Sequence, residues 1–516
     1  MNEKPKTKSR WRLLRWGLIG LVSIVTLAAI LITEEDWRGK RAWENYKRDA
    51  EARGERFEWA AFIPTNVPDD QNFFCTPIVA EALQAELPQT AGEIARQGLK
   101  STSRLNFDIY RGESELWPTN GGNWQKGKFT DLKEWQTYFR NFNATPAGQT
   151  NGFPAAAQPQ APATDVLLAL SVFNPALAEL RQASLRPAAR LPMNYDNGFE
   201  EVGTFLPWLA QEKRCAQFLQ LRSLAEMQDN QGAAALADVK LLLRLTDAIR
   251  NQPFFISHLV RIAMQAIALQ PIYECLAQHR WNDAQLTELE AALGEKDFLA
   301  DFAFSLRGER TCAIYTFEIQ RRTGEMVSSF MKDGREQIFT NNMRLMPSAF
   351  FYQNELALAR MYDQFVLPLV DLTNRTVSVA ACRKGEADMK EQVKHWSPYK
   401  IEALMVFPAV NKAVIKFVLI QSQVDLARVA CALERYRLAQ GKYPETLDAL
   451  TPQFIEELPH DLINGQPLHY RRTEDGRFVL YSVGWDEKDD GGKVVFTKGG
   501  SVDHENGDWV WQYPPN

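Results

Sequence analysis

Apolar and polar positions divide the start of the chain into two different pieces. Residues 16–32 (WGLIGLVSIVTLAAILI) carry no charge, and a helix of this length, at about 1.5 Å per residue, spans roughly 26 Å, which suffices for a thin bilayer. Residues 1–15 carry six Lys or Arg side chains and one Glu, and the positive-inside rule keeps such a basic tail in the cytoplasm. We therefore predict one transmembrane helix in the cytoplasmic (inner) membrane, with residues 33–516 extracytoplasmic, in the periplasm. The alternative is a cleaved signal peptide, but a small-residue cleavage pattern is weak here.

An amphipathic pattern follows the apolar run directly. Within residues 33–54, Glu44 and Arg48, and likewise Asp49 and Arg53, are four residues apart, a spacing that stabilises a helix. We expect this segment to form a helical stalk that leaves the membrane.

The next two segments lose the helical period. Residues 55–142 mix aromatic residues, turns and short periodic pieces, and we treat them as a mixed segment of uncertain fold. Residues 143–164 (NATPAGQTNGFPAAAQPQAPAT) are rich in Pro and Ala without periodicity, which predicts a long flexible loop or linker.

Apolar residues recur at helical spacing through residues 165–410, which predicts a large helical domain. The apolar stretches 254–271 and 402–421 contain internal polar residues such as Arg261 and Lys416, so we expect buried helices there and not further spans. Residues 232–253 have the pattern of one half of a tetratricopeptide hairpin, but no second copy follows at the required offset, and a general helical bundle is favoured.

The period changes again in residues 411–516. A helix is followed by strand-like runs at 467–473 and 477–483, joined through a Gly-containing turn. The predicted fold class is therefore mainly α: an N-terminal transmembrane helix, a large extracytoplasmic helical domain and a small C-terminal α+β module of a helix and an antiparallel sheet.

Composition and charge exclude several classes of function. The 516 residues are 45% hydrophobic and 24% charged, as in a packed globular protein. The net charge of −5 combines a tail of +5 with a remainder of −10, and an acidic body argues against a nucleic-acid partner. Gly122, Gly127 and Lys128 fit part of a phosphate-binding loop, but Phe129 replaces the Ser or Thr that would hold Mg²⁺, so we expect no nucleotide.

One resemblance to a known family lies in residues 411–516. This segment contains, in order, a helix, a Gly-x-Tyr-Pro turn, a Leu-Pro-x-Asp motif, a hairpin and a Tyr-Ser-x-Gly strand. The motif residues are Gly441-Lys442-Tyr443-Pro444, Leu458-Pro459 with Asp461, and Tyr481-Ser482-Val483-Gly484. This order resembles the C-terminal half of the type II secretion major pseudopilin. The whole chain also resembles membrane-anchored bacterial single-pass proteins that share this ending, which implies no particular activity. Residues 17–22 lack the Glu of the processed pseudopilin start, so the resemblance implies a borrowed fold and not a filament subunit.

The resemblance also implies a cation site, because the pseudopilin loop after the Tyr-Ser-x-Gly strand binds calcium. Asp486, Asp489 and Asp490 lie in that loop and Asp508 follows it; carboxylate oxygens on a tight loop suit Ca²⁺. We take these four as candidate calcium ligands, with a solvated acidic turn as the alternative reading.

No pattern in the chain identifies catalytic residues. The six cysteines are scattered singly, and Cys275 with His279 makes at most half of a zinc site. The favoured function is a membrane-anchored extracytoplasmic binding or scaffolding protein with a protein partner in the envelope and an unknown ligand. One alternative is an envelope hydrolase acting on glycan or peptide, which needs Asp69 or Asp70 in a pocket beside Trp117 or Trp124. Another is an accessory protein of a type II secretion-like system.

Overall fold

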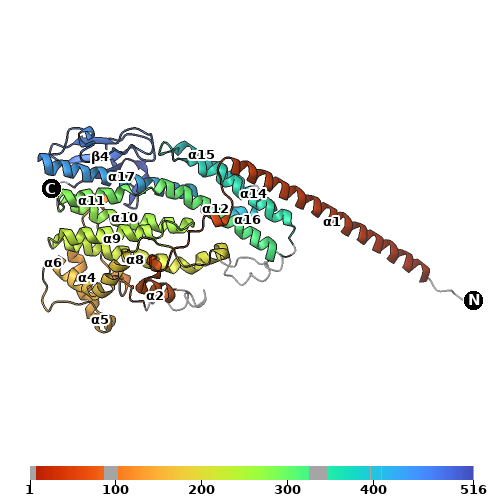
Figure 1. Cartoon of the computed structure of the whole chain (residues 1–516), viewed down its shortest axis with the longest axis horizontal. Coiled ribbons are helices and arrows are strands. Elements are labelled where there is room, and N and C mark those ends of the chain that lie inside the picture. Colours follow the sequence, from red (N-terminus) through yellow and green to blue (C-terminus); the bar gives the residue numbers. More distant parts are fainter. Residues whose placement is uncertain are drawn as a thin grey trace, which may run out of the picture.

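Helices make up most of this computed structural model, which describes residues 7–86, 103–119, 121–324, 344, 346–394, 397–407 and 410–514. The predicted fold class is confirmed: the protein is mainly α, with a long N-terminal apolar helix and small antiparallel sheets near the C-terminus (Figure 1). The helices before the central bundle are α1 (Thr7–Ala52), α2 (Pro77–Glu86), α4 (Leu132–Ala144), α5 (Pro146–Asn151), α6 (Pro162–Leu170) and α7 (Asn174–Ser184). Those of the bundle are α8 (Val202–Gln228), α9 (Gly232–Ala248), α10 (Phe255–Ala277), α11 (Asp283–Gly294), α12 (Phe298–Thr323), α14 (Ser348–Phe365), α15 (Val379–Lys394), α16 (Ile401–Val406) and α17 (Val410–Gln440).

Helix α1 joins the predicted membrane span and the predicted stalk without a break. It leaves one end of the body as a long projection, and its apolar part is entirely exposed (Figure 1). Its C-terminal part packs against α14. The helix ends before Gly54, whose φ of +93° suits a residue without a Cβ.

The body has one main hydrophobic core, which extends from Trp43 in α1 to Tyr513 near the C-terminus. Helix α10 lies centrally, in contact with α8, α9, α12 and α17. The segment 55–142 contributes buried aromatic side chains such as Trp59, Phe107 and Trp135 to this core. The predicted segments 55–142, 165–410 and 411–516 therefore share one core.

The flexible linker predicted over residues 143–164 is wrong for its first half. Helix α5 forms there, Phe153 is buried, and the Asn143 side chain bonds both the N–H and the carbonyl of Phe153 at 2.7 Å. Phe153 also packs against Phe139 and Phe142 of α4. Composition does not predict this ordered structure, because the burial of a single aromatic side chain can hold a Pro/Ala-rich segment against a hydrophobic core.

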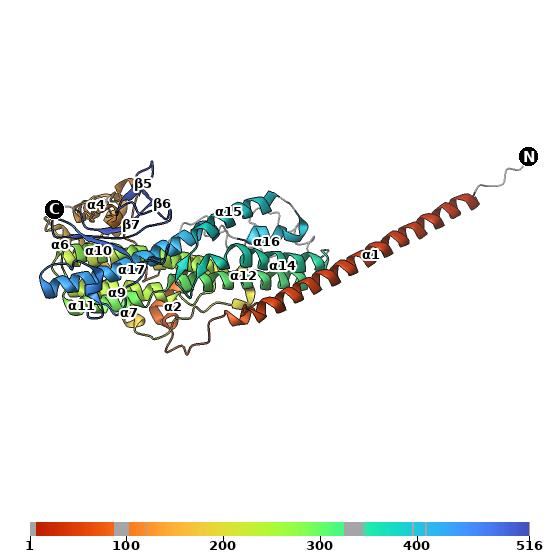
Figure 2. The same cartoon turned by 90° about the horizontal axis from the view of Figure 1, so that it is seen from above.

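The C-terminal part follows the predicted order of helix and strands. A short hairpin, β1 (Val370–Asp371) and β2 (Thr376–Val377), precedes it; the strands after α17 are β3 (His469–Arg472), β4 (Phe478–Ser482), β5 (Val494–Phe496), β6 (Val502–Gly507) and β7 (Trp509–Gln512). The antiparallel sheet has the order β3-β4-β7, and β5 and β6 form a separate ribbon at its side (Figure 2). The sheet packs on α17, at the end of the body opposite α1 (Figure 1).

Candidate functional site: the docked N-terminal helix and its polar clusters

The seam between α1 and α14 begins a few residues beyond the apolar run. The Asp36 carboxylate accepts a hydrogen bond from the Ala349 N–H at 2.6 Å, in the first turn of α14. A Cβ added to Gly39 would lie 3.3 Å from the Ala349 Cα and 3.5 Å from the Tyr352 Cβ, so the two helices cross here in close contact. The Asp36 carboxylate also satisfies one of the free N–H groups at the start of α14.

A set of polar and charged side chains joins α1 to the body at the other end of this seam. We call it the Asp363 cluster; it comprises Tyr46, Arg53, Glu55, Arg310 and Asp363. The Tyr46 hydroxyl donates to Asp363 at 2.5 Å, and Arg53 reaches the same carboxylate at 3.1 Å. Arg310 of α12 is fully buried, lies 3.5 Å from Asp363 and 2.8 Å from Glu55, and stacks over the Phe57 ring. Helix α1 is therefore held at both ends of its contact with the body.

The pKa shifts in this cluster follow from burial and pairing. Burial by itself raises the pKa of Glu55, but hydrogen bonds from Arg307 and the charge of Arg310 outweigh it and hold that pKa below its usual value. Burial and the hydrogen bond to Asp363 raise the pKa of Tyr46. Glu55 is thus an anion and Tyr46 a neutral donor at neutral pH, which is the charge pattern that the contacts require.

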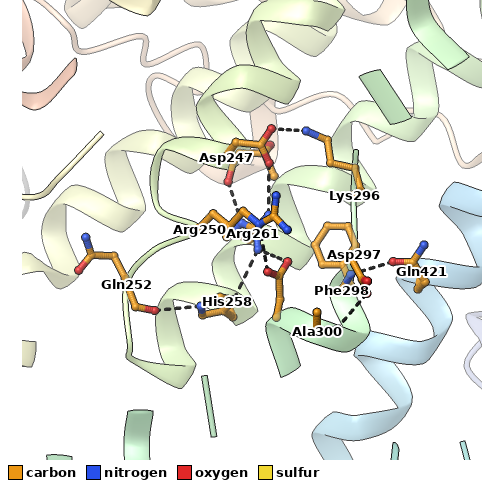
Figure 3. A network of polar contacts seen from close by, with 12 residues as sticks. Asp247, Arg250, Gln252, His258, Arg261, Lys296, Asp297, Phe298, Ala300 and Gln421 are labelled. Atoms are coloured by element: carbon orange, nitrogen blue, oxygen red, sulfur yellow. Dashed lines mark hydrogen bonds and ion pairs between the residues drawn. The ribbon is translucent and has the colours of Figure 1, made fainter. Parts of the chain in front are cut away.

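A second buried polar network lies deeper in the body, where α9, α10 and α12 meet (Figure 3). Arg261 of α10 is fully buried and is paired with Asp301 and, at 3.3 Å, with Asp247. Lys296 is paired with Asp247, and burial lowers its pKa against the attraction of that carboxylate. Charges this deep are tolerated only when they are paired, so the network fixes the relative positions of three helices.

His258 belongs to this network as a structural residue. Its Nε2 lies 2.9 Å from the Gln252 carbonyl, and its Nδ1 lies 3.5 Å from Arg261 Nη1. Because a carbonyl accepts and a guanidinium donates, Nε2 carries the proton and Nδ1 accepts. Burial and the nearby Arg261 lower the pKa of His258 to about 3, so this imidazole is neutral near pH 7.

A polar cavity of about 280 Å³ lies between the start of α12, α17 and the loop before β3. Arg375 pairs with Asp297 at 2.7 Å, and Arg428 pairs with Glu290 at 3.0 Å. Asp425 on the same wall has a pKa raised to about 6 by burial, with Arg428 acting against the shift. The two arginines of this cavity are therefore already paired with carboxylates of the protein.

The structure gives separate partners to the side chains of three of the four predicted calcium ligands, Asp486, Asp489 and Asp508, and the backbone N–H of the fourth, Asp490, donates to Asp508. Asp486 accepts from the N–H groups of Lys488 and Gly507, and Asp489 accepts from the Tyr481 hydroxyl. Asp508 accepts three loop N–H groups, at 2.7 to 3.3 Å, from Asp490, Gly492 and Lys493. Across the part of the chain that the structure describes, no three His, Cys, Asp or Glu side chains gather closely enough to hold a metal ion. The carboxylates of Asp486, Asp489 and Asp508 therefore close the loop by accepting hydrogen bonds from its backbone.

The hydrolase alternative needs Asp69 or Asp70 in a pocket beside Trp117 or Trp124, but the structure gives Asp69 and Trp124 other surroundings. The Asp69 backbone carbonyl accepts from Asn72 and Arg186, and its side chain faces the Cys75 thiol at 3.6 Å. Trp124 is buried against Tyr273 and Trp511. Asp69 belongs to a turn and Trp124 to the core, so the structure gives no support to a sugar-binding groove built from them.

The isolated His and Cys candidates have structural partners too. His279 lies 2.8 Å from the buried Glu434, and Cys275 is fully buried. Each of the six cysteines is a free thiol in the structure, five of them buried.

Comparisons with protein-family models, curated proteins and solved structures found no match to this chain. By length and composition, three helical segments within the described residues are apolar enough to cross a membrane: Trp11–Ala52, Pro162–Ser184 and Phe255–Ala277. The apolar window of the first is 0% buried, whereas those of the other two are 44% and 61% buried inside the body. Membrane anchoring through α1 is therefore plausible on structural grounds.

Sequence reasoning missed the residues that dock α1. Asp36 and Gly39 are unremarkable in a stalk sequence, and their partners lie some 310 positions further along the chain. A weak signal existed for the deeper network, because Arg261 and His258 interrupt an apolar helical stretch. A polar residue in such a place needs a buried partner.

Proposed function

We propose that this chain is a single-pass membrane-anchored binding or scaffolding protein, with its basic tail in the cytoplasm and its body outside the cytoplasmic membrane. One observation carries the proposal: the same unbroken helix is fully exposed over its apolar part and firmly docked over its polar part. An exposed apolar helix of this length is stable in a bilayer and costly in water.

The docking explains what such an anchor does for a scaffold. A flexible tether lets a body sample many orientations, whereas a helix that continues from the span into the core fixes one. The sheet-bearing end of the body lies opposite α1 (Figure 1), so it faces away from the membrane. A partner in the envelope would meet this end first.

Membrane extraction with a matched control tests the anchor. We expect the full chain to stay in the membrane pellet after alkaline carbonate washing, and Leu21→Arg with Ile24→Arg to release it, since each Arg costs about 3 kcal/mol at mid-span. Leu185→Arg, at a body position that is 73% exposed, should stay in the pellet. Release of the unaltered chain by carbonate would refute the anchor.

Protease digestion tests the orientation. Protease added to spheroplasts should digest the body while a tag on the basic tail stays protected. Protection of the body in intact spheroplasts would place it in the cytoplasm and reverse the proposed topology.

A second candidate is an accessory role in a type II secretion-like system, motivated by the resemblance of residues 411–516. Deleting that segment is a poor test, because α17 is part of the common core. A photo-crosslinker at Phe496, half-exposed on the β5–β6 ribbon, is a better one. Crosslinks to pseudopilin-like proteins from 496, with none from position 185, would support this role; equal yields at both positions would count against it.

A further inference from the structure

We infer that the end of the body formed by the last turn of α12 and the start of α14 rests on the phospholipid headgroups beside α1. This inference rests on the proposed membrane anchor and adds a second, peripheral contact with the same bilayer. It follows from the register of three helices, from the height at which α14 begins, and from the side chains exposed there.

The register comes from contacts at both ends of each helix pair. Helix α1 runs parallel to α14, because Asp36 bonds Ala349 while Tyr46 and Arg53 bond Asp363. Helix α12 runs antiparallel to α14: Arg310 lies beside Asp363, and the Arg321 guanidinium stacks over the Tyr352 ring at 4.8 Å. The C-terminal end of α12 and the N-terminal end of α14 are therefore level with Asp36.

The height of this level above the apolar core is small. Asp36 lies four residues beyond Ile32, the last residue of the apolar run, which is about 6 Å at 1.5 Å per residue. The headgroup layer on each side of a bilayer is about 5–7 Å thick. A helix tilt of about 20° changes the height of a neighbour about 9 Å away by only ~3 Å. The start of α14 therefore lies within or next to the headgroups.

The side chains exposed at this level suit lipid headgroups. Met346, just before α14, is 41% exposed, and Trp37 of α1 is 59% exposed with Arg41 stacked on its ring. Arg344 before α14 is exposed, and so is Arg322 in the last turn of α12, which is paired with Glu318 of the same helix. Trp at the interface, an apolar side chain that can enter the acyl boundary and arginines that can bind phosphate are the residue types that favour this layer.

The rigid connection between α1 and α14 also supports the contact with the headgroups. Because the Asp36 bond and the Asp363 cluster hold α14 against α1 at two points, the body cannot lift this end from the surface without breaking the seam. A second contact would also limit tilting of α1 and the body together relative to the bilayer.

Spin-label depth measurements on the full chain in lipid nanodiscs with phosphatidylethanolamine and phosphatidylglycerol test the inference. Labels are placed singly through Ile24→Cys, Met346→Cys and Leu185→Cys, and the unsubstituted chain reports background labelling of its native thiols. We expect position 24 to be accessible to oxygen and shielded from a water-soluble nickel reagent. Position 185 should show the reverse, and position 346 should be several-fold less accessible to nickel than position 185.

The outcomes separate the inference from the anchor on which it rests. If position 24 is embedded while position 346 is as accessible to nickel as position 185, the headgroup contact is wrong and the anchor stands. If position 24 itself is aqueous, the anchor is wrong. A label at 346 that is shielded in nanodiscs but accessible in detergent supports the contact and attributes the shielding to lipid.

Discussion

The close crossing at Gly39 makes the docking of α1 against α14 sensitive to one substitution, Gly39→Leu. The Cβ alone would lie 3.3 Å from the Ala349 Cα, and leucine adds three more carbon atoms that α14 leaves no room for. Overpacking of this kind costs about 1–3 kcal/mol. Separating the helices also strains the Asp36 bond to Ala349, and a lost hydrogen bond to a charged group costs about 1.5–3 kcal/mol.

The helix itself offsets part of this cost. Leucine is a better helix former than glycine by about 1 kcal/mol, so the net destabilisation of the α1–α14 seam is about 1.5–5 kcal/mol. A loss of about 1.5 kcal/mol raises the population of locally open states about 13-fold. We therefore expect amide hydrogens in residues 40–52 to exchange at least about 10-fold faster, as measured by hydrogen-exchange mass spectrometry on the membrane-embedded protein.

Two controls make this result interpretable. Gly39→Ala adds only the Cβ, which a shift of a few tenths of an ångström accommodates, and should exchange like the unaltered protein. Gly20→Leu makes the same replacement on the same helix where nothing lies within 4 Å, and should leave residues 40–52 unaffected. Unchanged exchange in Gly39→Leu would refute the claim that α1 is fixed by close contact with α14.

Three further predictions concern buried acidic residues. Asp301→Ala leaves Arg261 with a buried, partly unpaired charge, so we expect a loss of about 3–5 kcal/mol, seen as a lower midpoint in chemical denaturation. Burial raises the pKa of Glu355 to about 8, above its pKa in the unfolded chain, so the stability that the protonated side chain confers is lost as the pH rises from about 4.5 to 8. The Glu355→Gln variant should therefore have the same melting temperature as the unaltered protein at pH 4.5 and a higher one at pH 8. Equal melting temperatures at both pH values would contradict the pKa shift. Asp508→Ala removes three loop hydrogen bonds and should lower the melting temperature equally in millimolar calcium and in chelator. If calcium instead raises the melting temperature of the unaltered protein, and Asp486→Ala abolishes that rise, the loop rearranges around the ion.

The main features that the sequence predicted are those that depend on local pattern. A run without charge after a basic tail, an apolar residue every three to four positions and a Gly-containing turn between alternating strands each act over a few residues. The helix α1, the bundle and the antiparallel strands after α17 could therefore be predicted before any contact was known. At the start of α11, Asn282 and Gln285 form a capping box, another feature that acts over a few residues.

Features that depend on contacts between distant segments could not be predicted in this way. Phe153 lies in a Pro/Ala-rich segment whose composition favours a flexible chain, and only the aromatic side chains of α4 explain its burial. The acidic residues of the C-terminal loop share a composition with cation sites, but the direction of each carboxylate follows from which backbone N–H groups the folded loop brings near it.

Local sequence pattern is sufficient to predict an N-terminal apolar helix and a helical body, because both follow from the chemistry of neighbouring residues. The continuation of the apolar helix into the core, where Asp36, Gly39 and the Asp363 cluster hold it, depends on contacts that form only in the folded protein. The physical reason is range: helix periodicity is set within four residues, whereas the seam joins side chains more than 300 positions apart and exists only once the bundle has formed.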